Sequence, residues 1–410
     1  MPGARRLGTN NTGCRLKGVG LGAVSIQYSQ RVPEHDPVGF ANALSAKLAT
    51  RSRHVCVFLG AGASKACGLP DVAALEEKIV AGLDDDKQTV LKTELTDRNL
   101  EQALSRLRQI AALVEGDETV DGLTKESAEA LDAEVCQLLI GCLDVEDADL
   151  SPALQFAAWV ARADYLLPLE VFTVNYDLLL ETALDRLGVA YFDGFTGSLR
   201  ARFRTDLVEA TPADSLVWLP SFVARLWKLH GSVNWLRETT GGYAETVRLG
   251  TPVDGSPAAI YPSDTKYVDS RRVPFVVLHD RLRRALTEPE TLVLIAGYSW
   301  SDQDLNEMFF EAASRRPRSE FLSFSYSSIP GALAERAMST PNLQAIAGHE
   351  AIVGGVRADW AEPDPVPATD IWNDGKLAMH DYRNLATFLA RSSPPHSDLE
   401  ARLAEALGAI

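Results

Sequence analysis

Short apolar runs alternate with stretches of helical spacing along most of the chain. A continuous apolar run of strand length lies at 54–59, and the run at 291–296 is the least ambiguous buried strand of the sequence. The stretches 169–173 and 226–229, which include Glu170 and Lys228, predict two further strands. Shorter candidate strands lie at 258–261, 320–324 and 343–347. Helical spacing is found at 72–83, 178–187, 275–286 and 303–313. Because strands that run into a turn and then a helix are typical of β-turn-α units, the pattern predicts an α/β fold with a Rossmann-like, doubly wound parallel sheet.

Other regions lack this alternation. Apolar residues between 84 and 167 recur only at helical intervals, which predicts an insertion of three or four helices. Residues 191–225 show little periodicity and are expected to form a loop-rich crossover. After a proline-containing linker at 363–367, helices are predicted at 376–391 and 397–408. The expected organisation is a flexible basic arm (1–36), an α/β domain (37–360) that holds a helical insertion (84–167), and a helical C-terminal extension (361–410).

The chain has 410 residues, of which 46% are hydrophobic, and a formal net charge of −16. It is long enough for one large domain with insertions or for two domains. The acidic balance argues against direct binding of nucleic acid, because that needs Lys and Arg clustered against the phosphates.

The five cysteines form no C-x-x-C pair and leave an odd one over. This usage suits a reducing cytosol, and we expect no structural zinc site. No apolar run approaches the roughly 20 residues that span a bilayer, and no secretion signal is evident. We therefore expect a cytoplasmic protein that does not contact a membrane.

The first part of the chain is basic. Five cationic residues precede the first acid, Glu34, namely Arg5, Arg6, Arg15, Lys17 and Arg31. The composition predicts a mobile arm, with a transit peptide or an over-extended start as alternatives. The glycines at 18, 20 and 22 follow no convincing strand, and we expect them to be flexible.

Small and polar residues follow three of the predicted strands. They form the strings Gly60-Ala61-Gly62-Ala63-Ser64, Thr173-Val174-Asn175-Tyr176-Asp177 and Lys228-Leu229-His230-Gly231-Ser232. The carboxyl ends of parallel strands meet at one edge of a sheet, where open α/β sheets bind nucleotides. We therefore expect the three strings to converge on one site.

The first string is suited to a phosphate. Gly60 and Gly62 lack the Cβ that would keep backbone amides away from an anion, and the following helix points its positive end towards it. The alternative is a tight structural turn, since the string is neither a P-loop nor a full G-x-G-x-x-G.

The second string offers an amide and a carboxylate to the same cleft. Asn175 and Asp177 alternate at a strand end, with Tyr176 packed behind them. A neutral amide can hold a ribose hydroxyl or a water, and a neighbouring acid can orient it. The alternative is a helix cap, a common role of Asn and Asp.

His230 is our choice of catalytic residue among the seven histidines. An imidazole can accept a proton near neutral pH, and Gly231 and Ser232 leave room for a ligand. The alternative is a structural histidine, the role that we expect for His279 and His380, which lie in helical patterns.

A fourth polar strand end follows the run at 291–296. Gly297 and Ser299 suit an adenosine ribose and its phosphate. The alternative is a helix start capped by Ser301 or Asp302.

In order and content, these strings resemble the sirtuin (Sir2) superfamily, whose pattern is Gly-Ala-Gly-x-Ser, Thr-x-Asn-x-Asp, His-Gly and a late Gly-x-Ser turn. The resemblance covers roughly residues 54–325 and implies an NAD-binding domain over 37–360. It implies that Gly60, Ala61, Gly62 and Ser64 hold the NAD diphosphate. It further implies that Asn175 and Asp177 serve the nicotinamide ribose side, that His230 is the general base, and that Gly297 and Ser299 contact the adenosine half.

Two departures separate the chain from the protein deacylases of this superfamily. Deacylases carry a zinc ribbon with two C-x-x-C pairs and a Val-x-Phe-Gly-Glu segment, whereas the matching stretch here reads Ile260-Tyr261-Pro262-Ser263-Asp264-Thr265-Lys266. That segment, the context of residues 226–235 and the helical insertion are similar to bacterial SIR2-like proteins of anti-phage defence. Those relatives degrade NAD.

The resemblance implies an NAD⁺ glycohydrolase that releases nicotinamide and ADP-ribose and uses NAD⁺ as substrate without zinc. A protein deacylase, an ADP-ribosyltransferase and a non-catalytic sensor of NAD or ADP-ribose remain alternatives. It also implies a regulated complex, with a HerA-type ATPase favoured as partner over a short prokaryotic Argonaute. The surplus of amphipathic helix in the insertion predicts a homo-oligomer, the alternative being an insertion that packs wholly on its own domain.

Overall fold

The computed structural model describes residues 33–116, 118–210, 224–240, 243–253, 273–392 and 397–408. Within this part of the chain, the residues from Glu34 onward group into one compact unit. Three sequence predictions lie outside the described residues: the basic arm up to residue 32, the candidate strand at 258–261 and the segment 260–266. Glu34 and His35, at the end of the predicted arm, form the short strand β1 (Glu34–His35).

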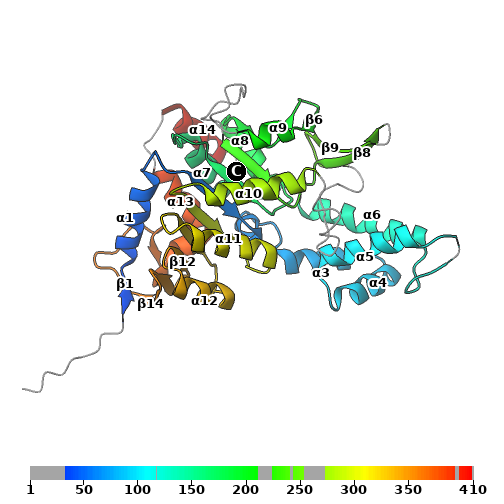
Figure 1. The fold of residues 1–410 in the computed structure, drawn as a ribbon, viewed down its shortest axis with the longest axis horizontal. Helices are drawn as coiled ribbons and strands as arrows, with labels where there is room; N and C mark the ends of the chain where they lie inside the picture. Colours follow the sequence, from blue (N-terminus) through cyan, green and yellow to red (C-terminus); the bar gives the residue numbers. More distant parts are fainter. Residues whose placement is uncertain are drawn as a thin grey trace, which may run out of the picture. The chain divides into compact units, whose positions relative to one another are not determined.

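A large sheet runs through the described residues in the order β1-β14-β13-β12-β11-β10-β2-β3-β7-β4 (Figure 1). Besides β1, its strands are β2 (Val55–Leu59), β3 (Glu170–Thr173), β4 (Tyr191–Phe192), β7 (Ala224–Lys228), β10 (Leu292–Ala296), β11 (Glu320–Phe324), β12 (Leu343–Ile346), β13 (Glu350–Val353) and β14 (Val356–Trp360).

The strands from β12 to β4 are parallel, and the antiparallel hairpin of β13 and β14 extends one edge. Along the chain, β2 comes first in this parallel part. Strands β3 and β7 follow on one side of it, and β10, β11 and β12 on the other. This order defines a topological switch point between β2 and β10, the place where doubly wound sheets bind dinucleotides. The predicted Rossmann-like fold is confirmed.

The central strands are buried on both faces, which explains their continuous apolar runs. In β2, Val55, Val57 and Leu59 enter one core, and Cys56 and Phe58 enter the other. The helices that pack in the first core are α1 (Pro37–Leu48), α2 (Ala61–Ala66), α7 (Ser151–Arg162), α8 (Leu179–Leu187), α13 (Tyr382–Arg391) and α14 (Ser397–Gly408). Those of the second core are α9 (Thr205–Glu209), α10 (Phe275–Thr287), α11 (Gln303–Arg315) and α12 (Gly331–Ser339).

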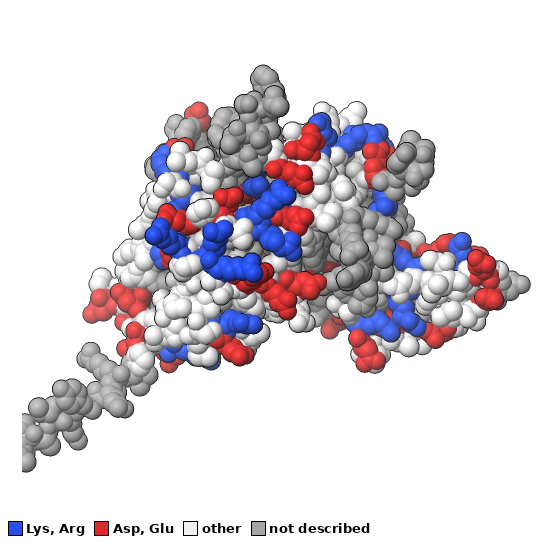
Figure 2. All heavy atoms as spheres, viewed as in Figure 1, with Lys and Arg blue, Asp and Glu red and all other residues white. Residues whose placement is uncertain are grey.

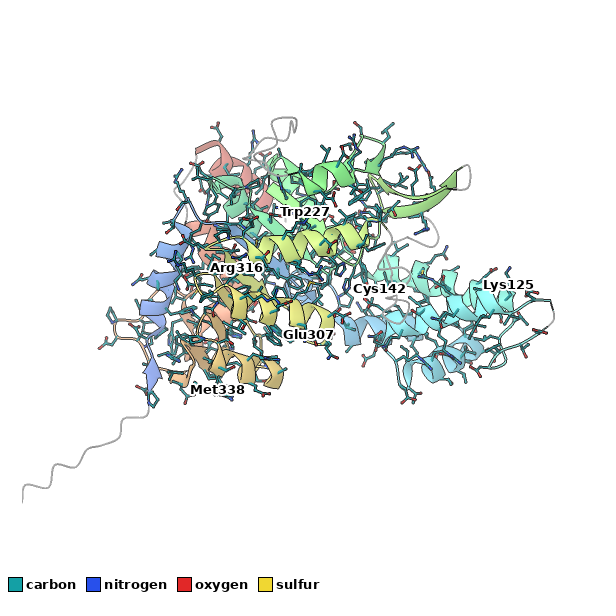
Figure 3. All side chains as sticks on the ribbon, viewed as in Figure 1. Lys125, Cys142, Trp227, Glu307, Arg316 and Met338 are labelled. Atoms are coloured by element: carbon teal, nitrogen blue, oxygen red, sulfur yellow. The ribbon has the colours of Figure 1, made fainter. Side chains whose placement is uncertain are left out.

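Four helices form a module with an apolar core of its own, which we call the helical module. They are α3 (Val72–Gly82), α4 (Asp85–Leu95), α5 (Leu100–Leu113) and α6 (Lys125–Cys142), and Figure 3 labels the two ends of α6. The predicted helical stretch at 84–167 thus holds four helices, α4 to α7. The last of these, α7, packs in the core of the sheet and not in the module.

Two predictions of local structure are wrong. Residues 191–210 contain short strands and α9, and two of these strands join a second, antiparallel sheet in the order β5-β6-β9-β8. Its strands are β5 (Phe195–Thr196), β6 (Arg200–Phe203), β8 (Trp235–Thr240) and β9 (Tyr243–Leu249). Strands of two to four residues are too short to show alternation.

The predicted helix at 376–391 begins later, at Tyr382. Asp381 caps it by accepting a hydrogen bond from Arg383 N over 3.0 Å. The preceding residues form the hairpin of β15 (Trp372–Asn373) and β16 (Lys376–Leu377) and the 3-10 turn η2 (Ala378–His380).

On the face drawn in Figure 2, Lys and Arg side chains gather in patches with Asp and Glu side chains among and beside them. Within the described residues, no helix combines the length and apolar character that crossing a membrane requires.

Three glycines let the turn after β2 touch the turn after β10. Gly60 N donates to Ala296 O over 3.0 Å, and Gly62 N donates to Gly297 O over 2.9 Å. A Cβ on Gly60 would lie 2.5 Å from Gly297 O, and a Cβ on Gly297 would lie 2.5 Å from Ala63 N. Gly297 also has a φ of +66°, which disfavours other residues. Backbone packing at the switch point therefore requires glycine at these positions.

We predict that Gly297→Ala lowers the free energy of unfolding by about 1–3 kcal/mol, because the new Cβ meets backbone atoms at a positive φ. Urea unfolding followed by circular dichroism measures the change. Gly250→Ala is the matched control, since a Cβ there meets nothing within 4 Å. Equal stability of the two variants would contradict the packing argument.

Candidate functional site at the carboxyl edge of the sheet

Strand register brings the predicted strings to one edge. Leu59, the last residue of β2, pairs with Thr173 of β3 and with Ala296 of β10. Thr173 pairs in turn with Lys228, the last residue of β7. The four turns that carry the candidate site residues therefore begin at the same level of the sheet.

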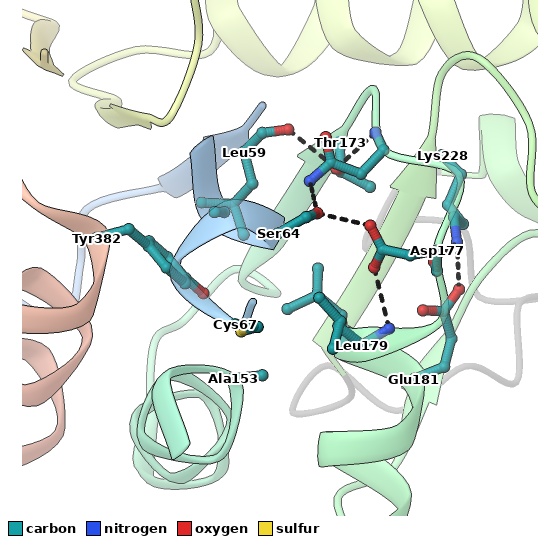
Figure 4. Close-up of a pocket in the computed structure, with 13 residues that line it drawn as sticks. Leu59, Ser64, Cys67, Ala153, Thr173, Asp177, Leu179, Glu181, Lys228 and Tyr382 are labelled. Atoms are coloured by element: carbon teal, nitrogen blue, oxygen red, sulfur yellow. Dashed lines mark hydrogen bonds and ion pairs between the residues drawn. The ribbon is translucent and has the colours of Figure 1, made fainter. Parts of the chain in front are cut away.

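Side chains from two of these turns form one hydrogen-bonded network (Figure 4). The Asn175 amide donates to Ser64 Oγ over 2.8 Å and to the Gly60 carbonyl over 3.0 Å. Ser64 Oγ donates to Asp177 Oδ2 over 2.6 Å. Ser64 and Asp177 are buried and Asn175 is half-buried. The structure thus brings Gly60, Ser64, Asn175 and Asp177 together.

Asp177 lies just before α8, whose N-cap residue is Leu178. The Asp177 carboxylate is therefore not the N-cap that was the alternative for it. Its Oδ1 nevertheless accepts from Leu179 N over 3.1 Å, while Oδ2 accepts from Ser64. One carboxylate thus contacts the first residue of the helix and fixes the hydroxyl that Asn175 contacts.

Lys228 is a buried residue of the site to which sequence reasoning assigned no role. Its side chain is 3% exposed, and its ammonium donates to the carbonyls of Tyr176 and Asp177 and pairs with Glu181 at 2.9 Å. Both carbonyls belong to the turn that carries Asn175. The lysine thus anchors this turn to β7, and a cation at the end of the predicted strand 226–229 was the signal that could have revealed it.

His230 follows β7 at the same edge and is half-buried. Its Nδ1 lies 3.7 Å from Glu101 Oε1, and its Nε2 lies 3.9 Å from Asp302 Oδ2. The ring stacks on His279 with a centroid distance of 6.3 Å and an interplanar angle of 18°. His279 was expected to be structural, and it does donate to the Phe275 carbonyl, but it also lies beside the candidate base.

The remaining candidates occupy the outer part of this edge. Ala61 is the first residue of α2, with Gly60 as its cap. Ser299 is exposed and shares a 2.8 Å hydrogen bond with Ser301. Asp302 caps α11 by accepting from Asp304 N and Leu305 N, which was the alternative for this turn.

A cavity of about 20 Å³ lies behind the network. Its walls include Ser64, Asp177, Cys67 and Tyr382 (Figure 4). Burial raises the pKa of the Cys67 thiol to about 12, so that thiol stays protonated. A space of this size admits water and excludes a dinucleotide.

Within the described ranges, no three His, Cys, Asp or Glu side chains are grouped so that they could hold a metal ion. The described cysteines are free thiols, at Cys56, Cys67, Cys136 and Cys142.

Residues 169–346 match the family model of the SIR2-like domain, which extends from the start of β3 to the end of β12. This match supports membership of the SIR2-like superfamily for the segment that it covers. SIR2-like family members are NAD-dependent enzymes, and the match therefore suggests NAD-related chemistry. No curated protein matches the chain.

We predict that Lys228→Met lowers the free energy of unfolding by about 3–5 kcal/mol, because it leaves Glu181 and two carbonyls without their cation. Chemical denaturation gives the value. In the control Lys92→Met, the exposed lysine donates a hydrogen bond to Gln88 over 3.2 Å, and we expect a change within about 1 kcal/mol. If Lys228→Met lowers the free energy of unfolding by no more than Lys92→Met does, the anchoring role of Lys228 is excluded.

Proposed function

We propose that the protein is an NAD⁺ glycohydrolase that converts NAD⁺ and water to nicotinamide and ADP-ribose. The observation that carries this proposal is the network of Ser64, Asn175 and Asp177 at the switch-point edge that also holds His230. This edge is where doubly wound sheets bind dinucleotides. The match to the SIR2-like domain supports NAD as the dinucleotide.

In this proposal, the diphosphate lies at Gly60, Ala61, Gly62 and Ser64. The amides of Gly60 and Gly62 are bonded to Ala296 and Gly297, so the attraction for the anion comes from the positive end of α2. Asp177 supports the nicotinamide ribose side through Ser64. Gly297 and Ser299 serve the adenosine half.

The reaction breaks the bond between C1′ of the ribose and the nicotinamide nitrogen. The electron pair of that bond leaves with nicotinamide, and C1′ passes through a transition state of oxocarbenium character. A water oriented by Asn175 forms the new bond to C1′, and its proton passes to His230. The carboxylates of Glu101 and Asp302 favour the imidazolium that results.

Deacylation, ADP-ribosyl transfer to a macromolecule and NAD sensing are the alternatives. Hydrolysis is favoured by the absence of C-x-x-C pairs from the sequence, because the deacylases of the superfamily carry a zinc ribbon. Incubation with NAD⁺ and an acylated peptide separates the four outcomes. Free ADP-ribose supports our proposal, whereas a deacylated peptide, an ADP-ribosylated peptide or unchanged NAD⁺ identifies one of the others.

We further propose that the enzyme acts in the cytoplasm in anti-phage defence. An unregulated NADase would exhaust its host, so we place it in a complex, with a HerA-type ATPase favoured over a short Argonaute as partner. Similarity to bacterial SIR2-like defence proteins supports this context. In the same proposal, 37–360 is the NAD-binding domain, with its helical insertion at 84–167, and 361–410 is its extension.

We predict that Asn175→Ala and His230→Ala each abolish NAD⁺ cleavage. For His230→Ala we expect a loss of about two to four orders of magnitude, since a positioned base contributes that much, and in Asn175→Ala the attacking water loses the amide that orients it. Chromatography of nicotinamide and ADP-ribose measures the rate. The exposed residues Asn373 and His349 provide matched alanine controls. Circular dichroism shows that each variant folds. Unchanged turnover in folded His230→Ala would remove this residue from the mechanism.

We also predict a homo-oligomer. The helical module buries most of its apolar residues within itself, but Leu113 on α5 is 75% exposed and Val120 is 38% exposed. Light scattering at micromolar concentration should give a discrete mass above that of one chain, 44.5 kDa. A mass of 44.5 kDa would exclude self-association of the isolated protein.

A further inference from the structure

The helical module places one carboxylate among the site residues. Glu101 lies in the first turn of α5 and is half-buried. The start of this helix is held on two sides. Asn99 and Gln102 form a capping box, and the Glu76 carboxylate of α3 accepts from Leu100 N over 3.1 Å. The position of Glu101 is therefore set by the fold of the module.

Tyr176 joins Glu101 to the turn that carries Asn175 and Asp177. Its hydroxyl donates to Glu101 Oε1. Burial and the Glu101 carboxylate raise the pKa of this phenol well above its usual value, so it remains a donor. The same turn supplies Tyr176 and Leu178 to the apolar core of the module, and Val233, close after His230, is buried in that core. The module thus packs on both turns that carry the candidate catalytic residues.

The same Glu101 oxygen faces His230. Oε1 lies 3.7 Å from Nδ1, while Asp302 faces Nε2 at 3.9 Å and His279 stacks on the ring. A carboxylate beside one ring nitrogen favours the tautomer with hydrogen on that nitrogen. Glu101 is the nearer of the two carboxylates, so it favours hydrogen on Nδ1 and a lone pair on Nε2. It also stabilises the imidazolium that forms on proton transfer.

We propose that Glu101 is a positioning residue for His230, so that the helical module is part of the active site and not only a covering of it. The inference rests on the proposed NAD⁺ hydrolysis. It follows that displacement of the module from Tyr176 would withdraw the carboxylate from the base. A partner that moves the module would then change turnover without touching NAD⁺.

The test is Glu101→Gln, which keeps the length of the side chain and an oxygen for Tyr176 but removes the charge. We expect kcat for NAD⁺ cleavage to fall by about 10- to 100-fold, with KM within about twofold, because outer partners of a reacting group typically act on this scale. Glu126→Gln is the matched control, since Glu126 is exposed in the first turn of α6. It should leave both constants unchanged.

Nitrogen-15 spectra of histidine-labelled protein provide a second readout that is independent of turnover. The His230 signals are assigned by their loss in His230→Ala. We expect neutral His230 in the wild type to carry its hydrogen on Nδ1, and this preference to weaken in Glu101→Gln. A merely structural role of Glu101 would lower stability but leave the tautomer unchanged.

The outcomes separate this inference from the proposed function. If the wild type does not cleave NAD⁺, the proposed function fails, and the spectra still decide whether Glu101 controls His230. Cleavage by the wild type with an unchanged kcat in folded Glu101→Gln would overturn the inference alone. The inference would also be overturned if His230 in the wild type carried its hydrogen on Nε2.

Discussion

The site depends on one close backbone contact, between the turn after β2 and the turn after β10. Gly62 N donates to Gly297 O over 2.9 Å, and no side chain fits between the two turns. This contact fixes where α2 begins, and α2 carries Ser64. Ser64 then receives the Asn175 amide and donates to Asp177. The glycines are therefore needed for the fold, independently of the phosphate-binding role that we propose for them.

The opposite edge of the sheet is closed by a buried charge cluster. The Glu170 carboxylate accepts from Trp227 Nε1 over 2.8 Å and pairs with Arg281 and with His54. Burial alone would raise the pKa of Glu170, but Arg281 and His54 hold it well below its usual value. Removal of one partner would leave a buried charge uncompensated. The cluster links β3 to β7 through Trp227 and to His54 just before β2, whereas the polar turns at the carboxyl ends of these strands form the candidate site.

Much of the architecture could be predicted from the sequence, because strands that are buried on both faces are continuous apolar runs. The runs at 54–59, 169–173 and 291–296 became β2, β3 and β10, each within a residue or so of the expected bounds. Part of the second sheet could not be predicted, since β5 has only two residues and its partner β6 pairs with the distant β9. The pairing of β8 with β9 did have a local signal, because the sequence between them is Gly241-Gly242, but it was missed. Glu101 was missed for a similar reason. A charged residue in the first turn of a helix is common, and only tertiary packing brings it to His230.

The boundaries of a family match and of a site need not coincide. The SIR2-like match covers 169–346 and omits Gly60 and Ser64 as well as Glu101. Yet Gly60 contacts the Asn175 amide, Ser64 contacts Asp177, and Glu101 contacts Tyr176. Each omitted residue therefore meets a matched one through a direct polar contact. The turn after β2 and the helical module that follows it belong to the same candidate site as the matched segment. Hydrogen bonds, and not sequence proximity, define the extent of this site.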